Sequence, residues 1–155
     1  MHDLLARVLR REEGRRFDPY LDSEGFWTVG YGHLIDRRKG GSLPAWIPPS
    51  FPLSDHEIEE LLLEDIRKFE DGLRAALVWW PTLDAVRQVV LVAMAFQMGV
   101  AGVLGFHEML AAVAEQRWQN AGFEMLESKW ARQTRGRSHR MSRAMISGAV
   151  EAFDL

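Results

Sequence analysis

The 155-residue chain contains no cysteine, and this absence excludes several kinds of protein. Without thiols there is no disulfide framework and no thiolate metal site, and the composition suits a reducing compartment. The five histidines form no H-E-x-x-H motif, so the sequence predicts no metal site.

Long apolar runs and an N-terminal targeting segment are also missing. No run approaches 18 apolar residues, so no membrane span is predicted. The first 14 residues alternate apolar and charged side chains and lack a signal-peptide core. These features predict a cytoplasmic chain with no stable membrane association.

The charges that the chain does carry are segregated, although the net charge is only −3. Residues 55–71 contain eight acids against two bases, and residues 128–143 contain six Lys or Arg and no acid. Solvated helix faces explain both stretches. The alternative is that the basic stretch meets an anionic polymer, such as bacterial cell wall or nucleic acid.

Apolar periodicity and turn residues predict one mainly helical domain with a small β region. A first helix is expected over residues 3–13, with Asp3 as its N-cap and Gly14 at its end. Aromatic residues and turn glycines predict a hairpin or meander over residues 17–34. Prolines and glycines predict a loop over residues 36–53.

The second half of the chain is predicted to be helical throughout. The capping box of Ser54 and Glu57 opens a long helix, and Asp84 caps the next one. Residues 85–98 are apolar on nearly all sides, as in a buried central helix. Shorter helices are expected over residues 107–115, 118–126 and 135–144, after turns at glycines 99, 102 and 105.

Two carboxyls and a hydroxyl near the N-terminus carry the strongest functional signal. Glu13 ends the first helix, Asp22 opens a turn, and Thr28 lies in the apolar run that follows. Glycosidic bond cleavage needs an acid for the leaving oxygen and a second carboxylate, and a hydroxyl can help to hold a water. Structural roles are the alternatives: pairing of Glu12 or Glu13 with Arg16, stabilisation of the turn by Asp22, and strand packing by Thr28.

These residues belong to a longer pattern: Glu13-Gly14, Tyr20-Leu21-Asp22 and residues 25–33, which read GFWTVGYGH. The pattern of E, eight residues, D, five residues, T, then G-x-G-H resembles the N-terminal signature of phage-type lysozymes. These are the T-even phage endolysin type, glycoside hydrolase family 24. The similarity continues through residues 93–99 and 128–137 and covers nearly the whole chain, from about Leu4 to beyond Arg140.

The resemblance implies a single α+β, mainly helical, lysozyme-like domain over residues 1–155. A small β-hairpin lobe is expected at about 14–55, a linking helix at about 54–78, and a helical lobe at about 79–155 with helix 3–13 packed on it. The implied activity is hydrolysis of the β-1,4 bond between N-acetylmuramic acid and N-acetylglucosamine in peptidoglycan. It is expected to need no cofactor and to be carried out by a monomer.

The resemblance also assigns the catalytic roles. Glu13 is expected to be the general acid, in a partly apolar pocket that keeps it protonated. Asp22 is the base that activates water, and Thr28 orients that water or bonds the catalytic carboxylate. Inversion at the anomeric carbon is implied, with the two carboxyls roughly 6.5–9.5 Å apart.

Further positions match the substrate cleft of the family. Leu34 and Phe96 are expected to pack against sugar, with Gly32 in the same substrate-binding set; plain core packing is the alternative for Phe96. Two other cleft positions carry Met109 and Glu124, where small polar residues are expected. This departure puts substrate contacts at those subsites in doubt.

Four more residues are expected to support the site. Arg137 would orient Glu13, with Gln97 as a second supporting residue. His33 and Asp65 match a structural pair that holds the hairpin to the long helix. A surface position in a basic helix is the alternative for Arg137.

Other functions remain open on the sequence alone. The same fold can serve as a wall-binding or baseplate component with little turnover, although the complete catalytic set argues against this. A nucleic-acid binder using residues 128–143 would show salt-dependent DNA binding, and the acidic total charge argues against it. A glycosidase acting on chitin-type polymers is a narrower alternative. The resemblance implies that a phage would hold the protein in the host cytoplasm until a membrane pore releases it to the wall.

Overall fold

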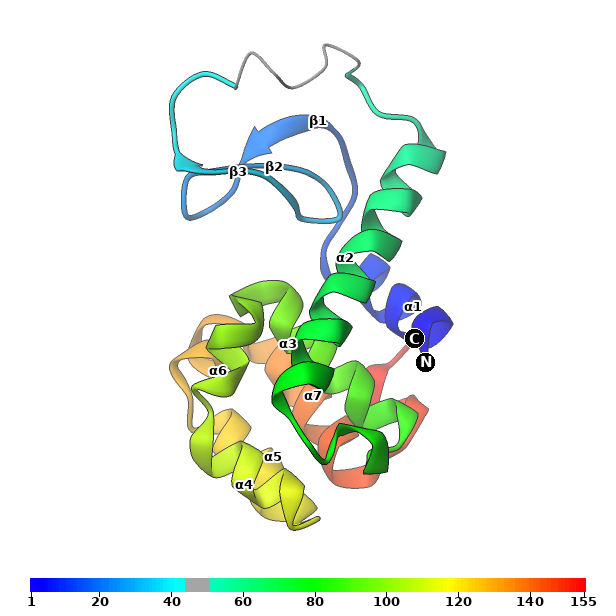
Figure 1. Cartoon of the computed structure of the whole chain (residues 1–155), viewed down its shortest axis with the longest axis vertical. Helices are drawn as coiled ribbons and strands as arrows, with labels where there is room; N and C mark the ends of the chain where they lie inside the picture. The colour runs from blue at the N-terminus through cyan, green and yellow to red at the C-terminus, as the bar shows by residue number, and fades with distance from the viewer. Residues whose placement is uncertain (44–50) are drawn as a thin grey trace. The chain divides into compact units, whose positions relative to one another are not determined.

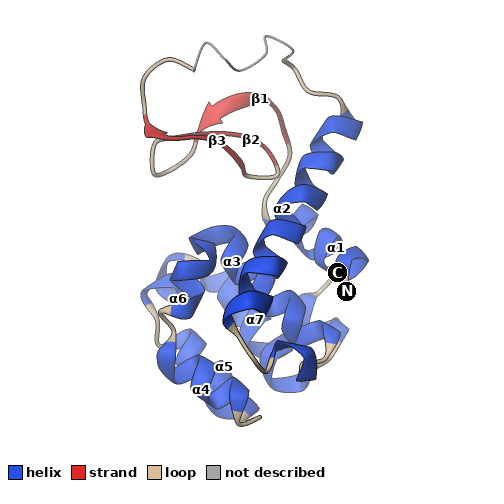
Figure 2. Ribbon diagram, in the orientation of Figure 1, coloured by secondary structure: helices blue, strands red, loops and turns tan. Residues whose placement is uncertain are grey.

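The structure, a computed structural model, describes residues 1–43 and 51–155 and shows an α+β fold. The helices are α1 (His2–Glu12), α2 (Asp55–Ala76), α3 (Ala85–Leu104), α4 (His107–Ala114), α5 (Trp118–Leu126), α6 (Lys129–Gln133) and α7 (Arg135–Ser147). Strands β1 (Arg16–Leu21), β2 (Phe26–Gly30) and β3 (His33–Lys39) form one antiparallel sheet in the order β1-β2-β3 (Figures 1 and 2). Short 3-10 helices cover Trp80–Thr82 and Val150–Phe153. The predicted fold class, helical with a small N-terminal sheet, is confirmed.

Residue contacts divide the chain into two compact units. The first, here called the helical unit, comprises Met1–Val8 and Ile66–Leu155. The second, the strand unit, comprises Leu9–Asp65 and holds the whole sheet. Helices α1 and α2 each contribute residues to both units.

The register of the sheet aligns three side chains of interest. Thr28 in β2 lies opposite Tyr20 in β1 and opposite Leu34 in β3. Because directly opposed residues share a face of a sheet, these three side chains form one row across it. The neighbouring row pairs Val29 with His33, and Val29 is almost fully buried.

The predicted loop over residues 36–53 is wrong at its start, because β3 runs on to Lys39. There Lys39 lies opposite Phe26 of β2. The polar sequence at the end of β3 favours a loop, but pairing with the neighbouring strand β2 decides the conformation. An edge strand such as β3 also tolerates charged side chains. The predicted loop residues Pro44, Pro48 and Pro49 lie outside the described residues.

Helix α1 begins one residue earlier than predicted, so Asp3 lies in its first turn and is not the N-cap. The apolar side chains of Leu5, Val8 and Leu9 form one stripe of the helix and are fully buried, at 0–1% exposure. The predicted start of α2 is confirmed. Ser54 Oγ accepts from the Glu57 N–H at 3.2 Å, and Glu57 Oε2 accepts from the Ser54 N–H at 2.7 Å.

Helix α3 is the apolar centre of the helical unit, as predicted. Asp84 Oδ1 caps it by accepting from the Arg87 N–H at 3.0 Å, and residues 89–95 are buried. The helix breaks at Gly99, where φ is 75°, but continues to Leu104 beyond the predicted end at Met98. By length and composition α3 could also cross a membrane, but a central helix of a packed domain meets the same criteria.

The last helices agree with the predicted positions to within a few residues, except that α6 was not predicted. Its five residues are too few for apolar periodicity to mark a helix. Ser128 nevertheless caps it, since its Oγ accepts from the Ala131 N–H at 3.1 Å.

Candidate active site

The strand unit contains both the predicted base, Asp22, and the predicted acid, Glu13. The Glu13 N–H donates to Leu9 O at 2.9 Å, so Glu13 directly follows the last turn of α1. Gly14 then adopts φ 58°, the left-handed conformation that ends a helix and redirects the chain into β1. The side chain of Glu13 is half-buried. A glutamate in this setting is partly shielded from water, as the acid of a glycosidase needs to be.

Asp22 organises the turn between β1 and β2. Its Oδ1 accepts from the N–H groups of Glu24 and Phe26, both at 2.9 Å, and its backbone bonds Gly25 and Phe26. The turn-stabilising role that the sequence left as an alternative is therefore present. Within residues 1–43 and 51–155 no donor bonds the other oxygen, Oδ2. One half of the carboxylate holds the turn, and the other half remains available to a water.

Thr28 is buried in the central strand, with 3% of its surface exposed. Its hydroxyl donates to Phe26 O at 3.1 Å rather than to a carboxylate. The oxygen of a hydroxyl that donates in this way still has lone pairs that can accept from a water. Of the two predicted roles, holding the water fits this arrangement better.

The charges of Glu13 and Asp22 both influence Tyr20, a residue that the sequence did not single out. Burial raises the pKa of the Tyr20 phenol, and the negative charges of Glu13 and Asp22 raise it further, against the opposing effect of Arg16. The Arg16 guanidinium carbon lies 5.1 Å from the centroid of the tyrosine ring. Glu13 and Asp22 therefore both act on one phenol in one local field. Only the fold brings them together, and the sequence offered no signal beyond the place of Tyr20 in the family pattern.

His33 and Asp65 form the contact expected of them. His33 Nδ1 lies 2.8 Å from Asp65 Oδ2, and Asp65 is only 5% exposed. The bond ties β3 to the last residue of α2 that belongs to the strand unit. Gly32 adopts φ 85° in the turn before β3, and Leu34 is 41% exposed, open to solvent as a sugar-contacting residue must be.

The remaining predicted site residues lie in the helical unit. Phe96 is half-buried, and its ring centroid lies 5.4 Å from that of Phe69. Gln97 Oε1 accepts from the indole N–H of Trp130 at 2.8 Å. Arg137 is half-buried on α7, and its predicted action on Glu13 stays a prediction.

The helical unit also contains the two positions that depart from the family pattern. Met109 is almost fully buried and Glu124 is partly exposed, and both line a cavity of about 180 Å³ together with His107 and Glu108. Among residues 1–43 and 51–155, no group of three His, Asp or Glu is arranged to hold a metal ion.

The chain is similar to several known proteins. The sequence profile of the phage lysozyme family matches residues 10–144. Over 96% of its length the chain is 32% identical to the pre-baseplate central spike protein of Enterobacteria phage T4, but this match spans only 28% of the spike protein. It is 30% identical to probable T4-type lysozyme 1 of Dictyostelium discoideum, over 94% of this chain and 95% of that protein. It is 32% identical to the endolysin of Salmonella phage P22, over 63% of this chain and 62% of that protein.

Proposed function

Because the chain belongs to the phage lysozyme family, we propose that it hydrolyses the β-1,4 bond between N-acetylmuramic acid and N-acetylglucosamine in bacterial peptidoglycan. A lysozyme-type activity on peptidoglycan follows from the family and its endolysin and lysozyme relatives. The observation that carries the finer proposal is the geometry of Asp22, whose Oδ1 is held by the N–H groups of Glu24 and Phe26 while Oδ2 stays open to a water. With Glu13 in the same unit, it supports a pair of carboxyls, the minimum that glycosidic cleavage requires.

In the proposed mechanism Glu13 acts as the general acid. It gives its proton to the glycosidic oxygen as the bond between the anomeric carbon and that oxygen breaks. The position of Glu13 directly after the last turn of α1, in the unit that also holds Asp22, supports this role.

Asp22 acts as the general base in the same step. Its Oδ2 takes a proton from a water that attacks the opposite face of the sugar, so the anomeric configuration inverts. The bonds from Glu24 and Phe26 to Oδ1 hold the carboxylate in place, and the Thr28 hydroxyl helps to position the water. The proton lost by Glu13 is regained from solvent, and Asp22 returns its proton to solvent, which completes the cycle.

Two product measurements test this proposal. Borohydride reduction of digested peptidoglycan, followed by mass spectrometry, is expected to find the new reducing ends on N-acetylmuramic acid. Proton NMR during digestion is expected to show the α-anomer first, because a β-bond is inverted. Reducing ends on N-acetylglucosamine would contradict the proposed bond, and early β-anomer would contradict the role of Asp22 as a base.

A catalytically weak wall-binding component on the same fold is the second candidate. The similarity to a phage spike protein favours it, since the chain matches one part of a longer protein there. Co-sedimentation of the chain with purified cell walls, together with the release of soluble fragments, separates the two candidates. Binding without release would favour the second.

The proposed setting follows the family as well. The protein acts as a monomer and reaches the wall from the host cytoplasm after release. Size-exclusion chromatography with light scattering at assay concentrations tests the monomer, and a dimer there would contradict it.

A further inference from the structure

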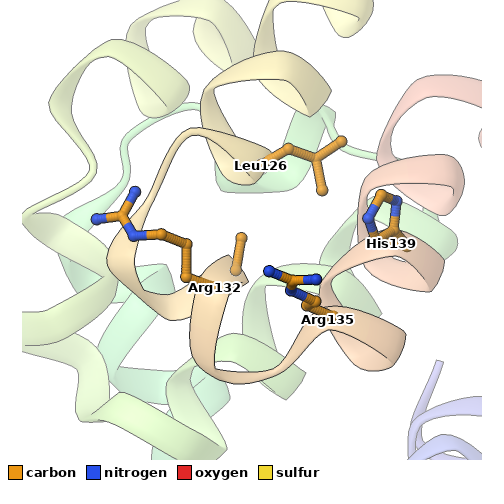
Figure 3. A pocket seen from close by; sticks show the side chains of 5 residues that line it. Leu126, Arg132, Arg135 and His139 are labelled. Atoms are coloured by element: carbon orange, nitrogen blue, oxygen red, sulfur yellow. The ribbon is translucent and has the colours of Figure 1, made fainter.

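The helical unit holds a pocket whose lining contains basic but no acidic side chains. The cavity has a volume of about 190 Å³ and is lined by Leu126, Ala131, Arg132, Arg135 and His139 (Figure 3). That volume is roughly six times the ~30 Å³ share of one water in the liquid, enough for a small polyatomic anion. None of the five lining residues is acidic, so the pocket favours negative charge.

Three successive helices build this pocket: α5 supplies Leu126, α6 supplies Arg132, and α7 supplies Arg135 and His139. Arg135 and His139 are four residues apart on one helix, which places their side chains on the same face. Both are exposed, and in the described part of the chain neither forms an ion pair. Two side chains with nitrogen donors therefore face one opening without a carboxylate to neutralise them.

Arg132, the second arginine of the lining, differs from Arg135 in its orientation and its hydrogen bonding. In Figure 3 the Arg132 guanidinium points away from the other labelled side chains, and its Nη1 donates to Glu127 O at 3.2 Å. The stem of Arg132 thus lines the cavity while its charge lies at the edge. A single weak bond to a backbone oxygen is readily exchanged for a charge-assisted bond to an anion.

We propose that this pocket binds a phosphate group. A phosphate offers several oxygens and close to two negative charges, which match the forked donors of Arg135, the ring N–H of His139 and the nearby Arg132. The pocket starts at the first residue of α7, where the helix dipole also favours an anion. Leu126 and Ala131 provide an apolar wall that limits hydration on one side.

The direct test titrates inorganic phosphate into ¹⁵N-labelled protein at constant ionic strength. The backbone signals of residues 126–139 are expected to shift saturably. The double variant Arg135→Gln with His139→Gln is expected to weaken binding about tenfold or more, because it removes charge-assisted bonds. The matched control, Arg7→Gln with His107→Gln, removes the same residue types from exposed positions elsewhere in the helical unit and is expected to bind as wild type does.

Equal weakening in the two double variants would overturn the proposal, because the effect would then come from overall charge. The same signal shifts produced by sodium chloride alone would overturn it as well. Because phosphate binding is measured without substrate, the outcome does not depend on glycosidase activity.

A second arm identifies where the phosphate comes from, either a free phosphate ester or a phosphorylated polymer on the wall. Cell walls are prepared with and without hydrofluoric acid, which strips phosphodiester-linked polymers, and binding is measured with the Glu13→Gln variant. The wall polymer is supported if less protein is retained on stripped walls than on intact walls. Adding Arg135→Gln and His139→Gln should then reduce retention on intact walls by the same amount. Retention unchanged by either treatment overturns the wall source and assigns the pocket to a soluble phosphate ester.

Discussion

The strand unit and the helical unit differ in the size of the apolar core that each of them buries. In the helical unit the fully buried side chains are large and apolar, such as those of Leu91, Met94, Met109, Met125 and Phe153. The strand unit has a smaller apolar core, around Leu9, Val29, Ile58 and Leu62. Both units also contain ion pairs, which in the strand unit include Arg10 with Glu59, Arg15 with Asp55 and His33 with Asp65.

Under the proposed mechanism, the two units contribute differently to activity and to stability. Catalytic carboxyls need water, polar partners and a local field, which an apolar core excludes. In the proposed mechanism, the strand unit supplies them to Glu13 and Asp22 through a turn, a helix end and a short sheet. The helical unit buries apolar surface instead, the main favourable contribution to folding. Substitutions in the two units are therefore expected to affect different measurements.

The largest expected effect is on activity, from Asp22→Asn. Asparagine keeps the side-chain oxygen that accepts from the N–H groups of Glu24 and Phe26, so the turn should survive. The base is lost, and the rate of peptidoglycan hydrolysis should fall by about 10²–10⁴-fold with a nearly unchanged melting temperature. Asp36→Asn is the matched control, since Asp36 also accepts from a backbone N–H in the strand unit. A large loss of stability in Asp22→Asn would show that the turn depends on the charge.

The next effect is on stability, from Arg87→Met in the helical unit. The Arg87 guanidinium pairs with Asp84, donates to the backbone oxygens of Met145 and Ile146, and lies 3.8 Å from the ring centroid of Trp118. Removing this nearly buried charge leaves its partners unpaired and should cost about 3–5 kcal/mol of unfolding free energy.

Urea denaturation measures this change, and activity per folded molecule should stay near wild type. Arg67→Met is the control, because Arg67 is exposed on α2 and should change stability by no more than about 0.5 kcal/mol. Equal losses in both variants would argue against a special role for Arg87.

A smaller effect is expected from His33→Ala, which tests the polar contacts of the strand unit. The substitution leaves the buried Asp65 carboxylate without the imidazole 2.8 Å away, and should cost about 1–3 kcal/mol. His56→Ala is the control, because the His56 side chain is 82% exposed and pairs with Glu60 at the surface. Identical urea midpoints for the two variants would contradict a stabilising role of His33.

The smallest effect is the acid dependence of stability from Glu70. Burial alone would raise the pKa of Glu70, but hydrogen bonds from His2 and Arg74 outweigh it and hold the pKa below its usual value of 4.5. A lowered folded-state pKa means that this contribution is present above pH 4.5 and is lost as the pH falls through the folded-state value. Below pH 4.5, wild type should therefore lose unfolding free energy more steeply than Glu70→Gln. Glu64→Gln, an exposed change on the same helix, should follow wild type.

The sequence predicted well those structural features that depend on residues close together in the chain. The caps at Ser54 and Asp84 were predicted because a cap depends on residues within three positions of it. The buried α3 followed from its uninterrupted apolar sequence. Its break at Gly99 was placed correctly, but its continuation to Leu104 was not, because packing after a break is set by distant residues.

Features that depend on distant residues were missed. The extension of β3 to Lys39 comes from pairing with Phe26, which the polar sequence of β3 does not reveal. The part of Tyr20 in the site depends on Glu13 and Asp22 converging from a helix end and a turn. Individual site residues could be proposed from the family pattern. The electrostatic effect of Glu13 and Asp22 on Tyr20 could not, because it depends on how the chain folds.

The central claim, that Glu13 is the general acid, is tested most directly by the clearing of outer-membrane-permeabilised Gram-negative cells. The comparison is between wild type, Glu13→Gln and Glu12→Gln, two neighbouring substitutions of identical chemistry. We expect wild type and Glu12→Gln to clear the suspension, and Glu13→Gln to lose about 10²–10⁴-fold in rate while remaining folded. Equal clearing by all three proteins would contradict the assignment of Glu13 as the acid.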